Sequence, residues 1–157
     1  AVSELPVEFF DETFGEQRSG AAGLDDFIVW RRDGLPSYQL ACVVDDFDLG
    51  VERVVRGADL IESTFRQLAL LRALKWSEPA YKHLSLVESS DGKRLAKRHG
   101  AKSIEALRRD GMSPAQMLSW IAASVCPASK EPLQNVEELA DRLAGQPWGQ
   151  QPVCFEA

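Results

Sequence analysis

Cysteine and histidine are scarce in this 157-residue sequence, which contains three cysteines and two histidines. Cys42, Cys126 and Cys154 form no C-x-x-C pair, and neither histidine lies at metal-ligand spacing from them. The sequence therefore predicts no zinc site, and we expect no protein-bound metal in this chain. An odd number of cysteines without a disulfide framework is typical of a reducing cytoplasm, where we expect the protein to act.

Long hydrophobic runs and an excess of positive charge are also missing. No apolar run reaches the length of about 18 residues that a membrane-spanning helix needs, so we expect no membrane partner. The 24 Asp and Glu residues outnumber the 18 Lys and Arg residues, giving a net charge of −6. This balance argues against nonspecific coating of nucleic acid, although a local basic patch can still bind it.

Short extended segments, typical of strands, recur through the first half of the sequence. We expect them at residues 7–10, 27–31, 51–57 and 81–87. The third is a β-branched run that stops at Gly57, a pattern typical of a buried strand. The second is expected to end in a turn made by the sequence Asp-Gly-Leu-Pro.

Helical patterns separate these segments and dominate the second half. The residues after Pro36 can start a helix or a strand, of which we favour the helix, and a strongly amphipathic helix is expected over residues 59–74. Ser113 and Gln116 form a capping box that starts another helix, and a last helix is expected to end at Gly145. This order predicts an α/β fold, in which part of a parallel sheet is followed by a small helical unit.

The stretch DGKRLAKRHG, residues 91–100, concentrates positive charge in an otherwise acidic chain. Its fully positively charged residues are Lys93, Arg94, Lys97 and Arg98. A solvated surface loop would explain such a run, and so would a loop that binds phosphate groups. The run itself does not distinguish these two interpretations.

Arg56 comes at the end of the third predicted strand, where open α/β sheets bind their ligands. A guanidinium in such a place needs an anion. An internal ion pair would supply one, and three aspartates lie nearby in sequence: Asp45, Asp46 and Asp59. The alternative is a substrate carboxylate held through two hydrogen bonds. Tyr38 could point to the same rim, or it could be a core residue.

Two blocks of sequence match a known family. RRDGLPSYQLACVVDD leads into VVRGADLIEST, and DGKRLAKRHG follows AYKHLSLVESS. In this order the blocks resemble the glutamyl-tRNA synthetase family of class I aminoacyl-tRNA synthetases, over roughly residues 25–125. The resemblance implies the second half of a Rossmann-like catalytic domain with a KMSKS-type loop over residues 1–102. A small helical subdomain, similar to a tRNA stem-contact element, would follow over residues 103–157.

The resemblance implies an ATP-dependent ligase. Such enzymes use ATP, with Mg²⁺, to activate L-glutamate to glutamyl-adenylate, and then transfer the glutamyl group to tRNA. Tyr38 and Arg56 match the glutamate-contacting positions of the family. Lys97 matches the position of the catalytic lysine in the family's loop. A lysine on a mobile loop can neutralise charge on the reacting triphosphate, which agrees with this role. The ATP-binding loop would comprise Arg94, Leu95, Ala96, Lys97 and Arg98. A monomer is expected.

Three positions depart from the family pattern. Ala96 stands where a serine is usual, Arg94 replaces the first lysine of the loop, and Gln39 replaces an asparagine often found after the substrate tyrosine. None of these changes removes an essential cation, but they leave the behaviour of the loop open.

The larger departure is the HIGH motif of the family's N-terminal half, because no His-x-Gly-His pattern occurs in these 157 residues. We therefore interpret the chain as a C-terminal half and expect it to be inactive by itself. Within the family, the sequence resembles the shortened glutamyl-queuosine tRNA(Asp) synthetase branch, and we expect it to belong there because few residues follow Arg98 for a large anticodon-binding domain. The alternatives are a fragment of an enzyme that charges tRNA(Glu), a non-catalytic module that binds tRNA or a protein, and an unrelated α/β nucleotide-binding domain.

Overall fold

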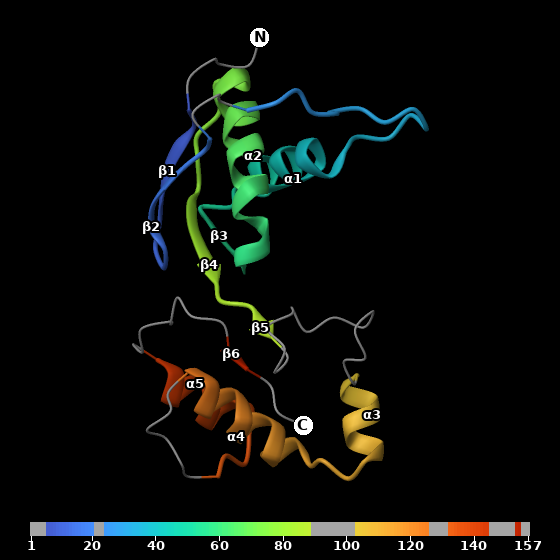
Figure 1. The fold of residues 1–157 in the computed structure, drawn as a ribbon, viewed down its shortest axis with the longest axis vertical. Coiled ribbons are helices and arrows are strands. Elements are labelled where there is room, and N and C mark those ends of the chain that lie inside the picture. Colours follow the sequence, from blue (N-terminus) through green and yellow to red (C-terminus); the bar gives the residue numbers. More distant parts are fainter. Residues whose placement is uncertain (1–5, 21–23, 89–102, 126–131, 145–152, 155–157) are drawn as a thin grey trace. The chain divides into compact units, whose positions relative to one another are not determined.

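The computed structural model of the chain describes residues 6–20, 24–88, 103–125, 132–144 and 153–154. The chain divides into two compact units, Ala1–Leu84 and Ser85–Ala157. Figure 1 shows a sheet with two helices in the first unit and a group of shorter helices in the second. The boundary expected between residues 102 and 103 of the catalytic domain and its tail stays a prediction.

A four-stranded sheet organises the first unit, with the strand order β2-β1-β4-β3. β1 (Glu8–Asp11) and β2 (Gly15–Arg18) form an antiparallel hairpin, while β3 (Arg53–Gly57) runs parallel to β4 (Ala80–Leu84). β1 and β4 are also parallel and meet at the pair Asp11 and Tyr81. The parallel sheet predicted from the sequence is therefore present, with one antiparallel hairpin added at its edge.

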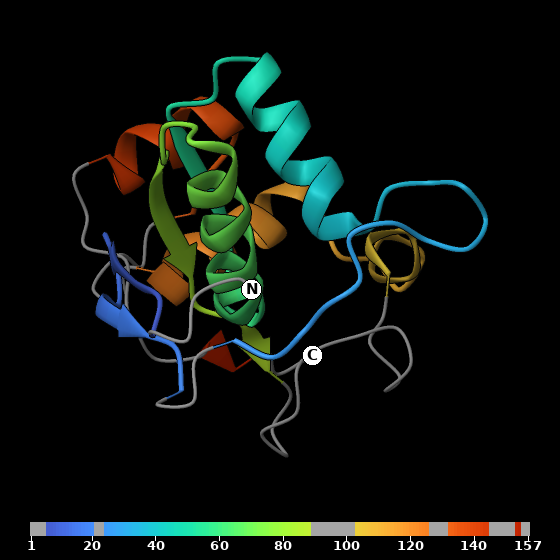
Figure 2. The same cartoon turned by 90° about the horizontal axis from the view of Figure 1, so that it is seen from above.

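Two helices cover one face of this sheet: α1 (Tyr38–Asp48), and α2 (Ile61–Leu74) with the short 3₁₀ helix η1 (Ala58–Leu60) before it (Figures 1 and 2). The core lies between helices and sheet and contains Val43 from α1, Phe65 and Leu68 from α2, and Tyr81 from β4. The apolar positions of α2 recur at helical spacing, so burying one stripe of the helix fills this space. The predicted helices at both places are confirmed.

The segment 27–31 was expected to be a strand, and this prediction is wrong. In the described structure it makes only an isolated bridge, between Trp30 and Pro36. The side chains of Ile28 and Trp30 are 70% and 59% exposed. The apolar run therefore has strand composition without the paired strand that would make it one. The turn that follows it is confirmed by the positive φ of Gly34, +82°.

The strand at 51–57 is confirmed over Arg53–Gly57, but the expectation that it is buried is wrong. Side chains alternate between the two faces of a strand, so Val54 and Arg56 face the helices while Val55 faces the other way. Val55 is 53% exposed, because in the described part of the first unit the helices cover only one face of β3. The strand predicted at 81–87 divides into β4 and a separate strand, β5 (Val87–Glu88).

The second unit contains α3 (Ile104–Arg109), α4 (Pro114–Val125) and α5 (Val136–Leu143), and a short parallel pair of β5 with β6 (Val153–Cys154). The predicted capping box is confirmed. The backbone N–H of Gln116 donates to Ser113 Oγ, and the backbone N–H of Ser113 donates to Oε1 of the Gln116 side chain. The predicted helix end at Gly145 lies outside the described residues.

Helices in the described ranges are too short or too polar to cross a lipid bilayer. The α/β fold class expected from the sequence is confirmed by the sheet and its covering helices.

Candidate functional site

Arg56 lies one residue before the carboxyl end of β3, on the face that α2 covers. Its Nε donates a hydrogen bond to Nε2 of His83, 3.2 Å away, and its Nη2 donates to Oγ1 of Thr64 at 2.7 Å. The guanidinium carbon lies 5.6 Å from the ring centroid of Tyr81, within the range of a cation–π contact. Strand register explains the first contact, because Arg56 pairs directly with His83 between β3 and β4.

The internal ion pair considered for Arg56 is not found. Among the residues that the structure describes, no carboxylate forms an ion pair with Arg56. Its hydrogen-bond partners there are an imidazole nitrogen and a hydroxyl oxygen, neither of which carries negative charge. Within the described part of the chain, the cation is therefore held in place without being neutralised, an arrangement that suits an anionic ligand.

Tyr38, the first residue of α1, brings its hydroxyl toward the same guanidinium. Burial raises the pKa of Tyr38, and the Cys42 thiol one helical turn away adds to this, while the charge and hydrogen bonding of Arg56 oppose it. The Tyr38 side chain is 53% exposed, so the alternative that Tyr38 is a core residue is wrong. The structure thus brings together Tyr38 and Arg56, as the sequence suggested.

Behind Arg56 lies a buried pair that sequence reasoning missed. Nδ1 of His83 is 2.6 Å from Oδ2 of Asp11, and both side chains are fully buried. Asp11 also accepts hydrogen bonds from the backbone N–H groups of Thr13 and Phe14. Burial acts to raise the pKa of Asp11, but the hydrogen bonds from His83, Phe14 and Thr13 outweigh it and hold this pKa below its usual value.

His83 left only a partial signal in the sequence. It lies in a strand that was expected to be parallel to the strand of Arg56, but the expected bounds of 81–87 end three residues beyond β4 and hide the pairing of His83 with Arg56. Asp11 left no such signal, because its strand joins β4 from 72 residues away in sequence. Cys42 is half-buried and lies next to Tyr38.

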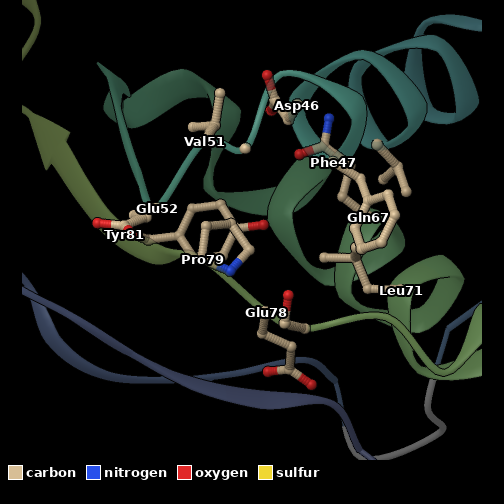
Figure 3. Close-up of a pocket in the computed structure, with 12 residues that line it drawn as sticks. Asp46, Phe47, Val51, Glu52, Gln67, Leu71, Glu78, Pro79 and Tyr81 are labelled. Carbon is tan, nitrogen blue, oxygen red and sulfur yellow. The ribbon is translucent and has the colours of Figure 1, made fainter.

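A hollow of about 400 Å³ opens at the other end of the parallel strands, where β3 and β4 begin (Figure 3). It is bordered by the acidic residues Asp46, Glu52 and Glu78, and no Lys or Arg is among the described residues that line it. The Tyr81 hydroxyl faces it as a neutral group, since burial raises the pKa of Tyr81 to about 12. This hollow does not suit an anionic ligand, which leaves the Arg56 end of the sheet as the candidate site.

The predicted ATP-binding loop, which includes Arg94, Leu95, Ala96, Lys97 and Arg98, lies outside the described residues. The assignment of Lys97 as the catalytic residue therefore stays a prediction. In the described ranges, no three or more His, Cys, Asp or Glu side chains are grouped so that they could hold a metal ion.

The family model for the catalytic domain of class I tRNA synthetases (E and Q) matches residues 2–144. The chain belongs to this family. This synthetase chain is 46% identical over 149 residues to the glutamyl-Q tRNA(Asp) synthetase of Rhodopirellula baltica, covering 90% of this chain and 45% of that protein. It is 50% identical over 102 residues to glutamate–tRNA ligase 1 of Sphingopyxis alaskensis, covering 65% of this chain and 21% of that protein.

Among solved structures, the synthetase chain is similar to a glutamate–tRNA synthetase from Elizabethkingia anophelis, with a TM-score of 0.81 and 22% identity. The match covers 99% of this chain and 35% of that one, and it shows a shared fold. The chain therefore spans less than half the length of each of these relatives.

Proposed function

We propose that the chain is part of an ATP-dependent ligase that activates L-glutamate to glutamyl-adenylate and passes the glutamyl group to tRNA. Membership of the synthetase family supports the reaction class. The observation that carries the choice of substrate is the Arg56 guanidinium, whose hydrogen-bond partners in the described structure are an imidazole and a hydroxyl rather than a carboxylate, and which lies beside the Tyr38 hydroxyl.

Arg56 would bind the side-chain carboxylate of glutamate. A guanidinium offers two parallel N–H donors to a carboxylate, and a charge-assisted pair of this kind is about twice as strong as a neutral one. The Tyr38 hydroxyl would donate a further hydrogen bond, since its raised pKa keeps it protonated. Glutamine lacks the negative charge, so a site built around Arg56 would prefer glutamate.

The chemical step joins the α-carboxylate of glutamate to the α-phosphorus of ATP, and the bond to pyrophosphate breaks. Negative charge on the departing pyrophosphate must be neutralised, and we assign this role to Lys97, with Mg²⁺ accompanying the ATP. In the second step a hydroxyl of the tRNA attacks the mixed anhydride, and AMP leaves.

We propose that the acceptor is tRNA(Asp), through its queuosine base. Over nearly the whole chain, identity to the glutamyl-Q tRNA(Asp) synthetase of R. baltica is 46%, whereas identity to glutamate–tRNA ligase 1 of Rubrobacter xylanophilus over a similar span is 37%. The longer span of the match to the glutamyl-Q tRNA(Asp) synthetase supports this acceptor, and the 50% identity over 102 residues to the S. alaskensis glutamate–tRNA ligase makes tRNA(Glu) the second candidate. A cytoplasmic location and a monomeric state remain sequence-based proposals.

The test is ATP–pyrophosphate exchange by the full-length protein that carries this sequence, with a panel of amino acids. We expect exchange with glutamate and at least a hundredfold less with glutamine or aspartate. Charging of tRNA(Asp) with and without queuosine then identifies the acceptor. Exchange that does not depend on the added amino acid, or that prefers glutamine, would contradict the proposal.

A further inference from the structure

We infer that Asp11 and His83 form a positioning pair, which fixes the Arg56 guanidinium so that one edge of it stays available to a substrate carboxylate. The inference rests on the proposed function of Arg56. Its basis is a continuous chain of hydrogen bonds from β1 through β4 to β3: Oδ2 of Asp11 to Nδ1 of His83 at 2.6 Å, and Nε2 of His83 to Nε of Arg56 at 3.2 Å.

The two ends of this chain select a single form of His83. The Arg56 guanidinium can only donate hydrogen bonds, so Nε2 of His83 must carry a lone pair. The ionised Asp11 carboxylate can only accept, so Nδ1 must carry the proton. Only the neutral imidazole with its proton on Nδ1 satisfies both neighbours, and full burial keeps bulk solvent from compensating for another form.

Asp11 is held in place as firmly as the imidazole that it orients. Its Oδ1 accepts from the backbone N–H groups of Thr13 and Phe14 at 3.0 and 2.9 Å, and its Oδ2 accepts from the backbone N–H of His83 at 3.0 Å. Neither carboxylate oxygen can swing away without leaving buried donors unpaired. The Asp11–His83 pair therefore fixes the Arg56 guanidinium relative to the backbone of β1 and β4.

Thr64 completes the arrangement on the helix side. Its hydroxyl donates to the carbonyl oxygen of Leu60 at 3.1 Å, which directs a lone pair toward Nη2 of Arg56 at 2.7 Å. His83 and Thr64 together occupy the edge of the guanidinium formed by Nε and Nη2. The end-on edge, formed by Nη1 and Nη2, keeps donors for a ligand, and a carboxylate can bind there through both oxygens.

A purely structural role for the pair is the competing interpretation, because Asp11 also joins the β1–β2 turn to β4. Two substitutions of His83 separate the roles. His83→Gln keeps an acceptor near the place of Nε2 and loses the donor to Asp11. His83→Asn keeps a donor near the place of Nδ1 and loses the acceptor for Arg56. A structural role of His83 depends mainly on its contact with Asp11. A positioning role depends mainly on its contact with Arg56.

The experiment is glutamate-dependent ATP–pyrophosphate exchange by the full-length protein, with melting temperatures measured in parallel. We expect His83→Asn to raise the KM for glutamate about tenfold or more, His83→Gln to raise it less than about threefold, and neither to change the KM for ATP by more than about twofold. Equal glutamate KM values in the two variants, or a higher value in His83→Gln, would overturn the inference.

A second measurement, on the 157-residue chain, does not depend on activity. Nitrogen-15 NMR of the His83 ring should show a proton on Nδ1 and an unprotonated Nε2 whose resonance shifts in Arg56→Lys. A proton on Nε2 would overturn the inference even in an active enzyme. If the wild-type protein shows no glutamate-dependent exchange while His83 has the expected form, the proposed function fails and the positioning geometry stands.

Discussion

Arg56 and His83 face each other across the parallel strands β3 and β4, and a hydrogen bond of 3.2 Å joins Nε of the guanidinium to Nε2 of the imidazole. The partner of the cation is thus an imidazole ring rather than a carboxylate. A buried ion pair would have neutralised Arg56, whereas an imidazole orients it and leaves its charge available. The predictions below follow from this relationship and from its neighbours.

Asp11 should make the stability of the chain sensitive to acid. Its pKa in the folded state lies below the usual value of about 3.9, so the ionised carboxylate stabilises the fold above that pH, and this contribution is lost as the pH falls through the folded pKa. We expect Asp11→Asn to lower the free energy of unfolding by about 2–3 kcal/mol at pH 7, since hydrogen bonds to a charged group are lost, and by clearly less at pH 3.

Urea unfolding of residues 1–157 at several pH values between 7 and 3 measures this difference. Glu16→Gln on the same hairpin is the control, because the Glu16 side chain is exposed and should matter by less than about 0.5 kcal/mol. A destabilisation by Asp11→Asn that is the same at pH 7 and pH 3 would show that the carboxylate charge contributes nothing.

Tyr38 should contribute to glutamate binding through its hydroxyl. Tyr38→Phe removes the group that lies beside Arg56 and keeps the ring, so we expect the KM for glutamate to rise about three- to tenfold, as for one lost neutral hydrogen bond, with the KM for ATP unchanged. Ser37→Ala is the matched control, because the Ser37 hydroxyl makes no capping bond to α1. Equal kinetics in the two variants would remove Tyr38 from the site.

Lys97 should act in the transition state of adenylate formation. We expect Lys97→Ala to lower kcat and kcat/KM together by about a hundredfold, with little change in the KM for ATP. Lys93→Ala serves as the comparison and should have a mild effect that fades at high salt, since exposed charges are screened. Small, salt-dependent effects of both substitutions would mean that the basic stretch is a diffuse patch.

Local patterns in the sequence were enough to predict the elements that depend on local chemistry. The amphipathic stripe of α2 and the capping box of Ser113 and Gln116 are properties of neighbouring residues, and both are confirmed. The sequence also suggested that Tyr38 could lie near Arg56, beside the alternative of a core residue. The start of a helix and the carboxyl end of the next parallel strand lie at the same edge of such a sheet.

Long-range pairing decided what could not be predicted. Residues 27–31 have strand composition, yet strand formation needs a partner that composition does not reveal. The exposure of Val55 depends on which face of β3 the helices cover. The contact between Asp11 and His83 joins residues 72 positions apart, and it exists only because β1 adds to the sheet beside β4.

The most direct test of the central claim is the glutamate dependence of ATP–pyrophosphate exchange by the full-length protein with Arg56→Ala and Arg56→Lys. A charged hydrogen bond contributes about 1.5–3 kcal/mol, so Arg56→Ala should lower kcat/KM for glutamate roughly tenfold to a hundredfold, with the KM for ATP unchanged. Arg56→Lys should also be impaired, because an ammonium group cannot reproduce the planar fork. Wild-type kinetics for glutamate in both variants would show that Arg56 is a structural residue and would contradict the account.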